Sequence, residues 1–106
     1  MTAKAQALMD VLKERRSILS TEGWSEDQPH PHEGSKLAAA GACYAMHAVA
    51  AMNGQTDDSA PADWPWSEQW WNPNTPRFEL VKAAALILAE IERLDEIEAR
   101  KDIYEI

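Results

Sequence analysis

The chain has 106 residues and a mass of 11.9 kDa, which is the size of a single domain spanning residues 1–106. Its composition, 45% hydrophobic and 26% charged, is typical of a globular protein and excludes wholesale disorder. No apolar run approaches the ~18 residues that cross a bilayer and no signal segment opens the chain, so we expect a cytoplasmic protein without membrane contact. The single cysteine, Cys43, excludes a disulfide framework. A core this small is marginal, which leaves homo-oligomerisation open.

The formal charge of −8 is concentrated in the middle of the chain, where residues 23–75 carry Lys36 against seven acids. A field of this sign repels phosphate backbones, so duplex nucleic acid is not an expected ligand. The same field attracts a basic protein surface. The other interpretation is that the charge serves solubility.

Two helices are expected in the first half of the chain. The first covers about residues 3–20, where apolar residues repeat at helical spacing: Leu8, Val11, Leu12, Ile18 and Leu19. The second covers about 34–53 and ends at Asn53-Gly54, which tolerate a left-handed backbone. Its many alanines favour a helix and allow close approach, so we expect it to be central and flanked on more than one face.

A third helix is expected over about 76–101, because Thr75 is a good N-cap and Pro76 a good first residue. The strongest periodic signal of the chain lies here, in the 4-3-4-3 spacing of Leu80, Ala84, Ile87, Ile91 and Leu94. Phe78, Val81, Ala85 and Leu88 widen this stripe. No segment alternates as a β-strand would. The sequence therefore predicts an all-α fold, a three- to four-helix bundle with a long Trp-rich loop over 54–75 between the second and third main helices.

That loop holds four of the five tryptophans: Trp64, Trp66, Trp70 and Trp71. The indoles can cap the open end of the bundle, or they can form a recognition surface, since Trp is enriched at interface hot spots. The stretch Ser67-Glu68-Gln69-Trp70 is expected to make one short helical turn. The candidate binding residues are the loop tryptophans together with Trp24, Asp57, Asp58, Asp63, Glu68 and Arg77.

The sequence signals for metal-binding or catalytic residues are weaker than those for the Trp-rich loop. His30 and His32 form an extended His-x-His pair that could bind a divalent cation, against the alternative of a solvated loop. Glu92 and Asp95 share a helix face and could hold Mg²⁺, against the alternative of a solvated helix end. His47 is expected to be packed and satisfied by one hydrogen bond, and the Cys43 thiol to be inert in an Ala-rich helix. No catalytic residue and no cofactor is predicted.

Several ordered pieces of the sequence resemble a family of small, mostly uncharacterised phage and prophage proteins. They cover most of residues 10–96: Glu14-Arg15-Arg16, Glu22-Gly23-Trp24, His30 and His32, Cys43-Tyr44-Ala45, Trp64-Pro65-Trp66, Trp70-Trp71-x-Pro73, and the run from Leu80 to Asp95. The resemblance implies a non-catalytic accessory protein in the host bacterial cytosol. Its expected role is counter-defence of the anti-CRISPR type, in which an acidic, Trp-bearing face binds a basic surface of a bacterial CRISPR or other defence effector.

The Arg-rich first helix, the Gly-Trp pair and the Leu-Asp helix ending are also similar to MazG-like all-α nucleotide pyrophosphohydrolases. Those enzymes need a Glu-Glu-x-x-Glu motif on the second helix for Mg²⁺, and here that helix has Glu33, Lys36 and alanines. The similarity implies the scaffold without the metal site. The alternative function is therefore a nucleotide-binding protein, either a sponge for a nucleotide immune signal or a diverged pyrophosphohydrolase using Glu92, Asp95 and the loop histidines His30 and His32.

Overall fold

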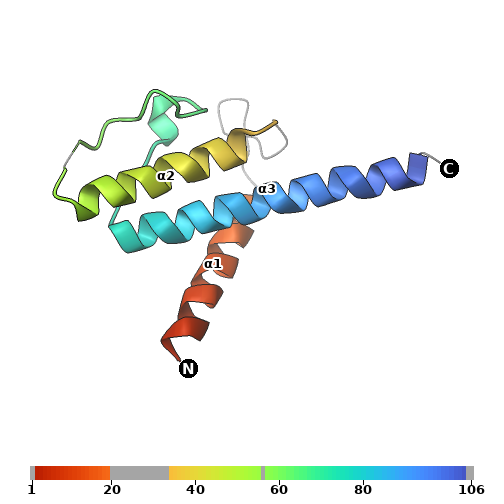
Figure 1. Cartoon of the computed structure of the whole chain (residues 1–106), viewed down its shortest axis with the longest axis horizontal. Helices are drawn as coiled ribbons and strands as arrows, with labels where there is room; N and C mark the ends of the chain where they lie inside the picture. The colour runs from red at the N-terminus through yellow and green to blue at the C-terminus, as the bar shows by residue number, and fades with distance from the viewer. Residues whose placement is uncertain (1, 20–33, 56, 105–106) are drawn as a thin grey trace.

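Three stretches of the sequence form helices, and α3 is the helix that the other two share. The computed structural model describes residues 2–19, 34–55 and 57–104, with the backbone alone at 19 and at 102–104. In these ranges the elements are α1 (Ala3–Leu19), α2 (Lys36–Met52), a short 3-10 helix η1 (Glu68–Trp70) and α3 (Pro76–Tyr104), with no strand among them. The all-α prediction is confirmed, and the loop between α2 and α3 is long and irregular, as expected (Figure 1).

The ends of the helices follow their local chemistry. The Thr75 hydroxyl accepts a hydrogen bond from the Phe78 N–H at 3.2 Å, and the Glu79 N–H donates to the Thr75 carbonyl at 2.9 Å. Gly54, at φ +82°, takes the left-handed backbone expected after α2, whereas Asn53 at φ −102° does not. Both the predicted cap of α3 and the predicted end of α2 are therefore confirmed, the latter through Gly54.

The beginning of α2 is capped from another helix. Ser35 makes no side-chain cap, and the Ala38 N–H donates instead to Oε2 of Glu90 in α3 at 3.0 Å. The Arg93 guanidinium donates to Oε1 of the same carboxylate at 2.6 Å. A buried carboxylate thus meets the positive end of the α2 dipole and is balanced by a cation one turn further along α3.

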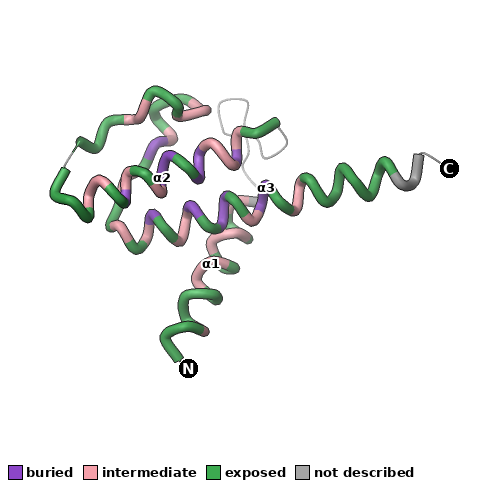
Figure 2. The backbone as a smooth tube through the Cα atoms, in the orientation of Figure 1, coloured by how far each residue is buried: buried purple, intermediate pink, exposed green. Residues whose placement is uncertain are grey.

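α2 and α3 pack closely because small residues line their contact. A Cβ built on Gly41 would lie 3.1 Å from both the Ala83 carbonyl oxygen and Ile87 Cγ1. The buried faces of the two helices turn toward each other, and the Trp-rich loop covers a second side of α2 (Figure 2). The prediction that α2 is flanked on more than one face holds, but the central helix is α3, since α1 packs on α3 and makes no contact with α2 within the described ranges.

Ion pairs hold α1 against α3. The Arg15 guanidinium makes a two-point pair with the Glu92 carboxylate, Arg77 pairs with Asp10 at 2.9 Å, and Lys82 lies 3.8 Å from Glu14. Val11 and Ile18 are half-buried, but Leu8 and Leu12, which belong to the same predicted stripe, are exposed. Only part of the apolar face of α1 is used in this contact.

The periodic stripe of α3 does not face the core. The five members of the 4-3-4-3 series are all exposed: Leu80, Ala84, Ile87, Ile91 and Leu94. Of the residues predicted to widen the stripe, Ala85 is buried and Phe78, Val81 and Leu88 are half-buried. The buried residues of α3 are Glu79, Ala83, Ala85, Leu86, Ala89 and Glu90, and four of them, Glu79, Ala83, Leu86 and Glu90, lie one residue before a member of the stripe. The C-terminal half of α3 projects beyond the rest of the molecule (Figure 1). The chain's strongest hydrophobic signal therefore describes a surface of this fold.

No helix in the described part of the chain combines the length and the apolar character that a bilayer crossing requires.

Candidate functional site

The Trp-rich loop is fixed on α2 by an aromatic cluster centred on Tyr44, whose side chain is fully buried. The Trp71 indole stacks on the Tyr44 ring with centroids 4.7 Å apart, and Trp64 meets both rings edge-on at 5.5 and 5.0 Å. Trp66 packs edge-on against Trp64 at 5.4 Å. These three indoles join the hydrophobic core, so their structural role, one of the two interpretations of the sequence, is observed.

Hydrogen bonds fix the register of the loop on the helix. The Trp71 Nε1–H donates to the Asp58 carbonyl oxygen at 2.9 Å, and the Asn72 N–H donates to the Tyr44 hydroxyl at 3.1 Å. The Trp64 Nε1–H donates to the Ser67 carbonyl oxygen at 3.1 Å, just before η1. The loop is long but has its own internal order, which is typical of functional loops.

His47 joins α2, α3 and the loop. Its Nδ1 lies 2.6 Å from Oε2 of Glu79 in α3, and its Nε2 lies 2.9 Å from Oδ1 of Asp58 in the loop. Because both ring nitrogens face carboxylate oxygens, the imidazolium, which donates from both, fits the site best. The hydrogen bond to Glu79 is the main cause that raises the pKa of His47, with Asp58 adding to it against the opposing effect of burial.

Glu79 is the only fully buried carboxylate among the described residues. Besides His47, it accepts a hydrogen bond from the Asn74 N–H at 3.2 Å. Inspection of the sequence missed Glu79 and predicted one hydrogen-bond partner for His47 instead of two. One sequence signal could have identified Glu79. It begins the helically spaced series 79-83-86-90, in which Ala83 and Leu86 are flanked by two acids, Glu79 and Glu90.

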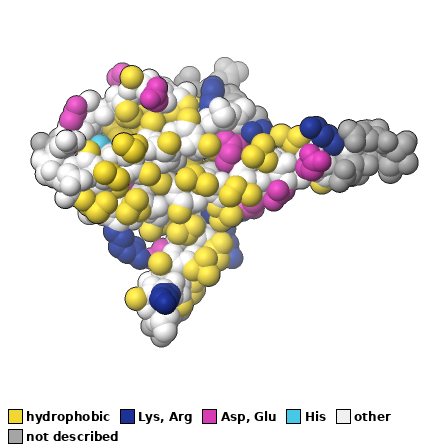
Figure 3. Space-filling view, in the orientation of Figure 1, with side chains coloured by type: hydrophobic (Ala, Val, Ile, Leu, Met, Phe, Trp, Pro, Cys, Tyr) yellow, Lys and Arg dark blue, Asp and Glu magenta, His cyan; other side chains and the backbone are white. Residues whose placement is uncertain are grey.

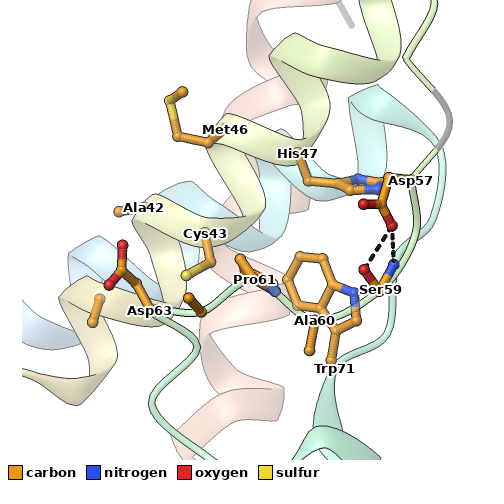
Figure 4. A pocket seen from close by; sticks show the side chains of 12 residues that line it. Ala42, Cys43, Met46, His47, Asp57, Ser59, Ala60, Pro61, Asp63 and Trp71 are labelled. Atoms are coloured by element: carbon orange, nitrogen blue, oxygen red, sulfur yellow. Dashed lines mark hydrogen bonds between the residues drawn. The ribbon is translucent and has the colours of Figure 1, made fainter.

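A pocket of about 550 Å³ lies between α2 and the loop (Figure 4). Its apolar walls come from Met46, Pro61, Trp71 and several alanines, and Cys43 lies among them. Asp63 and Asp57 lie toward opposite ends of the pocket in this view. His47 also lines the pocket, near Asp57. The arrangement therefore combines an apolar interior with two exposed carboxylates and one imidazole, and a few polar groups around apolar walls are the general form of a ligand site.

Two titratable side chains of the pocket, the Asp57 carboxylate and the Cys43 thiol, have shifted pKa values. Asp57 accepts hydrogen bonds from the Ser59 hydroxyl at 2.6 Å and the Ser59 N–H at 3.0 Å, and these bonds lower the pKa of Asp57. Burial, helped by the charge of Asp63, raises the pKa of the Cys43 thiol. The thiol therefore stays protonated at neutral pH, in agreement with the expected inert cysteine.

The surface of the loop is acidic. The four predicted acids, Asp57, Asp58, Asp63 and Glu68, are all exposed, and residues 57–75 contain no Lys or Arg. Acidic side chains are seen over the loop at the upper edge of the molecule, above a broad hydrophobic area (Figure 3). Of the paired indoles, Trp71 is buried and Trp70 is half-buried. The acids and the aromatic cluster therefore form one continuous structural unit.

The remaining candidates lie elsewhere. Arg77 is at the start of α3, where it pairs with Asp10 of α1, away from the pocket lining. Trp24, His30 and His32 lie outside the described residues. Within the described residues no three His, Cys, Asp or Glu side chains are grouped so that they could hold a metal ion. Glu92, the proposed partner of Asp95 in a Mg²⁺ pair, is engaged by Arg15.

Comparison of the chain with protein-family models, with curated proteins and with solved structures finds no match.

Proposed function

We propose that this chain is a non-catalytic binding protein that takes a basic side chain of a partner protein into the pocket between α2 and the loop. The observation that carries the proposal is the pocket itself, with apolar walls and the carboxylates of Asp57 and Asp63 at its rim. The exposed Glu68 side chain adds a further negative charge on the loop, whereas the charge of Asp58 is offset by its pair with His47.

Arginine and lysine fit this chemistry. Each has an aliphatic stem that packs on apolar walls such as Met46 and Pro61, and a cationic head that pairs with carboxylates. The pocket volume of about 550 Å³ is ample for one such side chain. The lowered pKa of Asp57 keeps that carboxylate charged well below neutral pH. A phosphate group would meet the same carboxylates as like charges, so the field disfavours nucleotides.

Fixed geometry supports a binding role. The rim acids sit on a loop that is already ordered by Tyr44, His47 and Trp71, so little conformational entropy is lost when a partner docks. The described carboxylates with buried positions, Glu79 and Glu90, are engaged by His47 and Arg93. Glu79 and Glu90 serve the fold, as does Asp58 through its contact with His47, whereas Asp57 and Asp63 lie exposed beside the pocket.

The resemblance to phage and prophage proteins suggests which partner protein the pocket would bind. A bacterial defence effector with a basic nucleic-acid channel offers the arginines and lysines that the pocket fits. Occupation of such a channel by an acidic protein would exclude its nucleic acid, since both compete for the same charges. Counter-defence of the anti-CRISPR type is the role proposed here.

The test is binding of the full chain to a panel of purified CRISPR effector complexes at about 50 mM and about 500 mM salt. We expect salt-sensitive binding that the Asp57→Asn/Asp63→Asn double variant loses. The matched control is Asp95→Asn/Glu96→Gln, which removes the same charge from the exposed part of α3 and keeps binding. Equal binding by the two double variants, or no binding to any complex, would overturn the proposal.

A further inference from the structure

The exposed stripe of α3 has the spacing of a helix–helix interface. The side chains of Leu80, Ile87, Ile91 and Leu94 are 42%, 44%, 49% and 53% exposed. With Ala84 they follow the 4-3-4-3 pattern in which two helices interlock side chains along a common seam. Such a pattern on a solvent-facing side has no function in the isolated chain.

The isolated chain also buries few large apolar side chains. Among the buried apolar residues of the described ranges, five are alanines, and the large ones are Leu37, Tyr44, Trp71 and Leu86. The radius of gyration is 15.2 Å, against about 13 Å for a compact domain of this length. Much of the apolar surface that a single domain would normally cover is therefore left uncovered.

The uncovered apolar surface extends from α3 onto α1. On α1, Leu8 and Leu12 are 61% and 43% exposed, and hydrophobic side chains of α1, α2 and α3 are visible together on one face (Figure 3). Together the α3 stripe and these two leucines expose six large apolar side chains, and clustered exposed apolar residues of this kind mark protein interaction sites.

We propose that a second copy of this chain covers this face, with the two α3 helices antiparallel along the stripe. The heptad positions that extend the stripe at its two ends are Arg77, whose side chain pairs with Asp10 of α1 but stays 63% exposed, and Glu98. In a parallel pair each would meet its own copy as a like charge, whereas an antiparallel pair brings the Arg77 end of one chain to the Glu98 end of the other. A two-fold axis through the middle of the stripe makes the contact self-complementary.

The projecting half of α3 fits this arrangement. Up to Arg93 the helix still packs on its own chain, since Glu92 pairs with Arg15 of α1, whereas residues 94–101 are all exposed along the projecting end of α3 (Figure 1). Ile91 and Leu94 are 49% and 53% exposed where this end begins. In the antiparallel pair they lie along the Leu80 half of the partner's stripe. The acidic loop lies at another edge of the molecule and stays accessible in the dimer.

Sedimentation equilibrium tests the proposal on the full chain. We expect a mass twice the 11.9 kDa of the chain, and a return to 11.9 kDa for Ile91→Glu/Leu94→Glu. Both side chains point away from the core, so the helical circular dichroism signal should persist. The control is Met46→Glu, which changes an equally apolar residue, 67% exposed, on the pocket side of α2 and should stay dimeric. A monomeric wild type, or a dimeric Ile91→Glu/Leu94→Glu variant, would overturn the proposal.

Cysteine cross-linking tests the orientation in a Cys43→Ala background. Leu80→Cys and Leu94→Cys proteins are oxidised separately and as a mixture. The antiparallel pair predicts a disulfide-linked dimer in the mixture that exceeds both separate samples. Efficient cross-linking of each variant with itself would show a parallel pair and contradict the proposed arrangement.

Discussion

The buried carboxylate of Glu79 in α3 lies 2.6 Å from Nδ1 of His47 in α2, and the opposite ring nitrogen of His47 lies 2.9 Å from Asp58 in the Trp-rich loop. One imidazole therefore connects the two packed helices and the loop that forms the proposed binding surface. A buried carboxylate is costly without a partner, so the loop, α2 and α3 are energetically coupled through this ring.

The first prediction concerns pH. Because the folded protein raises the pKa of His47 above the value of 6.5 in the unfolded chain, protonation favours folding. The stabilisation is complete below about pH 6.5 and declines as the pH rises through the raised pKa of the folded state. Urea unfolding of wild type from about pH 6 to 9 should show a falling free energy of unfolding.

The matched variant for this prediction is His47→Gln, which can still hydrogen-bond but does not titrate. The difference in unfolding free energy between wild type and His47→Gln should shrink as the pH rises. A difference that is constant, or that grows with pH, would contradict the assigned role of the imidazolium. His47→Ala, which leaves Glu79 buried without its cation, should cost about 3 kcal/mol near neutral pH.

A second prediction concerns the close contact of α2 with α3. Gly41→Ala would place a methyl group 3.1 Å from the Ala83 carbonyl oxygen, which is backbone and cannot rotate away. The overpacking cost of about 1–3 kcal/mol should exceed the gain of up to about 1 kcal/mol in helix propensity, so the variant should be less stable. Thermal unfolding by circular dichroism checks this, and a variant more stable than wild type would show that the helices can separate freely.

A third prediction concerns the cap of α2. Glu90→Ala removes the acceptor of the Ala38 N–H and the partner of Arg93, and should cost about 2 kcal/mol. Glu90→Gln keeps an oxygen acceptor for the Ala38 N–H and should lose less stability than Glu90→Ala. Chemical denaturation of both variants separates the two contributions, and equal stability of Glu90→Ala and wild type would refute the cap.

A fourth prediction separates the indole ring of Trp71 from its hydrogen bond. Trp71→Phe keeps an aromatic ring near Tyr44 but loses the bond to the Asp58 carbonyl, at a cost of about 1 kcal/mol. Trp71→Ala also removes the stacked ring and should cost about 3–5 kcal/mol. Unfolding monitored by circular dichroism measures both, and a near-neutral Trp71→Ala would mean that the cluster does not stabilise the loop.

Local chemistry made much of the fold predictable. Thr75-Pro76 marks the start of α3, Gly54 marks the end of α2, and the stretch at 68–70 forms the short turn expected there. These signals depend on residues close in sequence, which is why they survive without knowledge of the tertiary structure. The acidic character of the loop is likewise visible in the sequence alone.

The register of α3 was not predictable in the same way. The apolar series from Leu80 to Leu94 is stronger than the series of Glu79, Ala83, Leu86 and Glu90, yet the weaker one is buried. Its two acids are acceptable inside only because His47, Arg93 and the Ala38 N–H meet them. His47 and Ala38 lie on α2, so they meet these acids only once the two helices are packed. The pattern of hydrophobic residues along α3 therefore cannot reveal these contacts.

The central claim, that the pocket between α2 and the loop accepts a basic side chain, is tested most directly by NMR. Acetyl-Gly-Arg-Gly-amide is titrated into the ¹⁵N-labelled chain, with acetyl-Gly-Glu-Gly-amide as the charge control. We expect saturable shift changes confined to amides of residues 42–47 and 57–63 with the arginine peptide only, lost in Asp57→Asn/Asp63→Asn and kept in Asp95→Asn/Glu96→Gln. Shift changes that are absent, that both peptides cause equally, or that survive loss of the two rim carboxylates would contradict the claim.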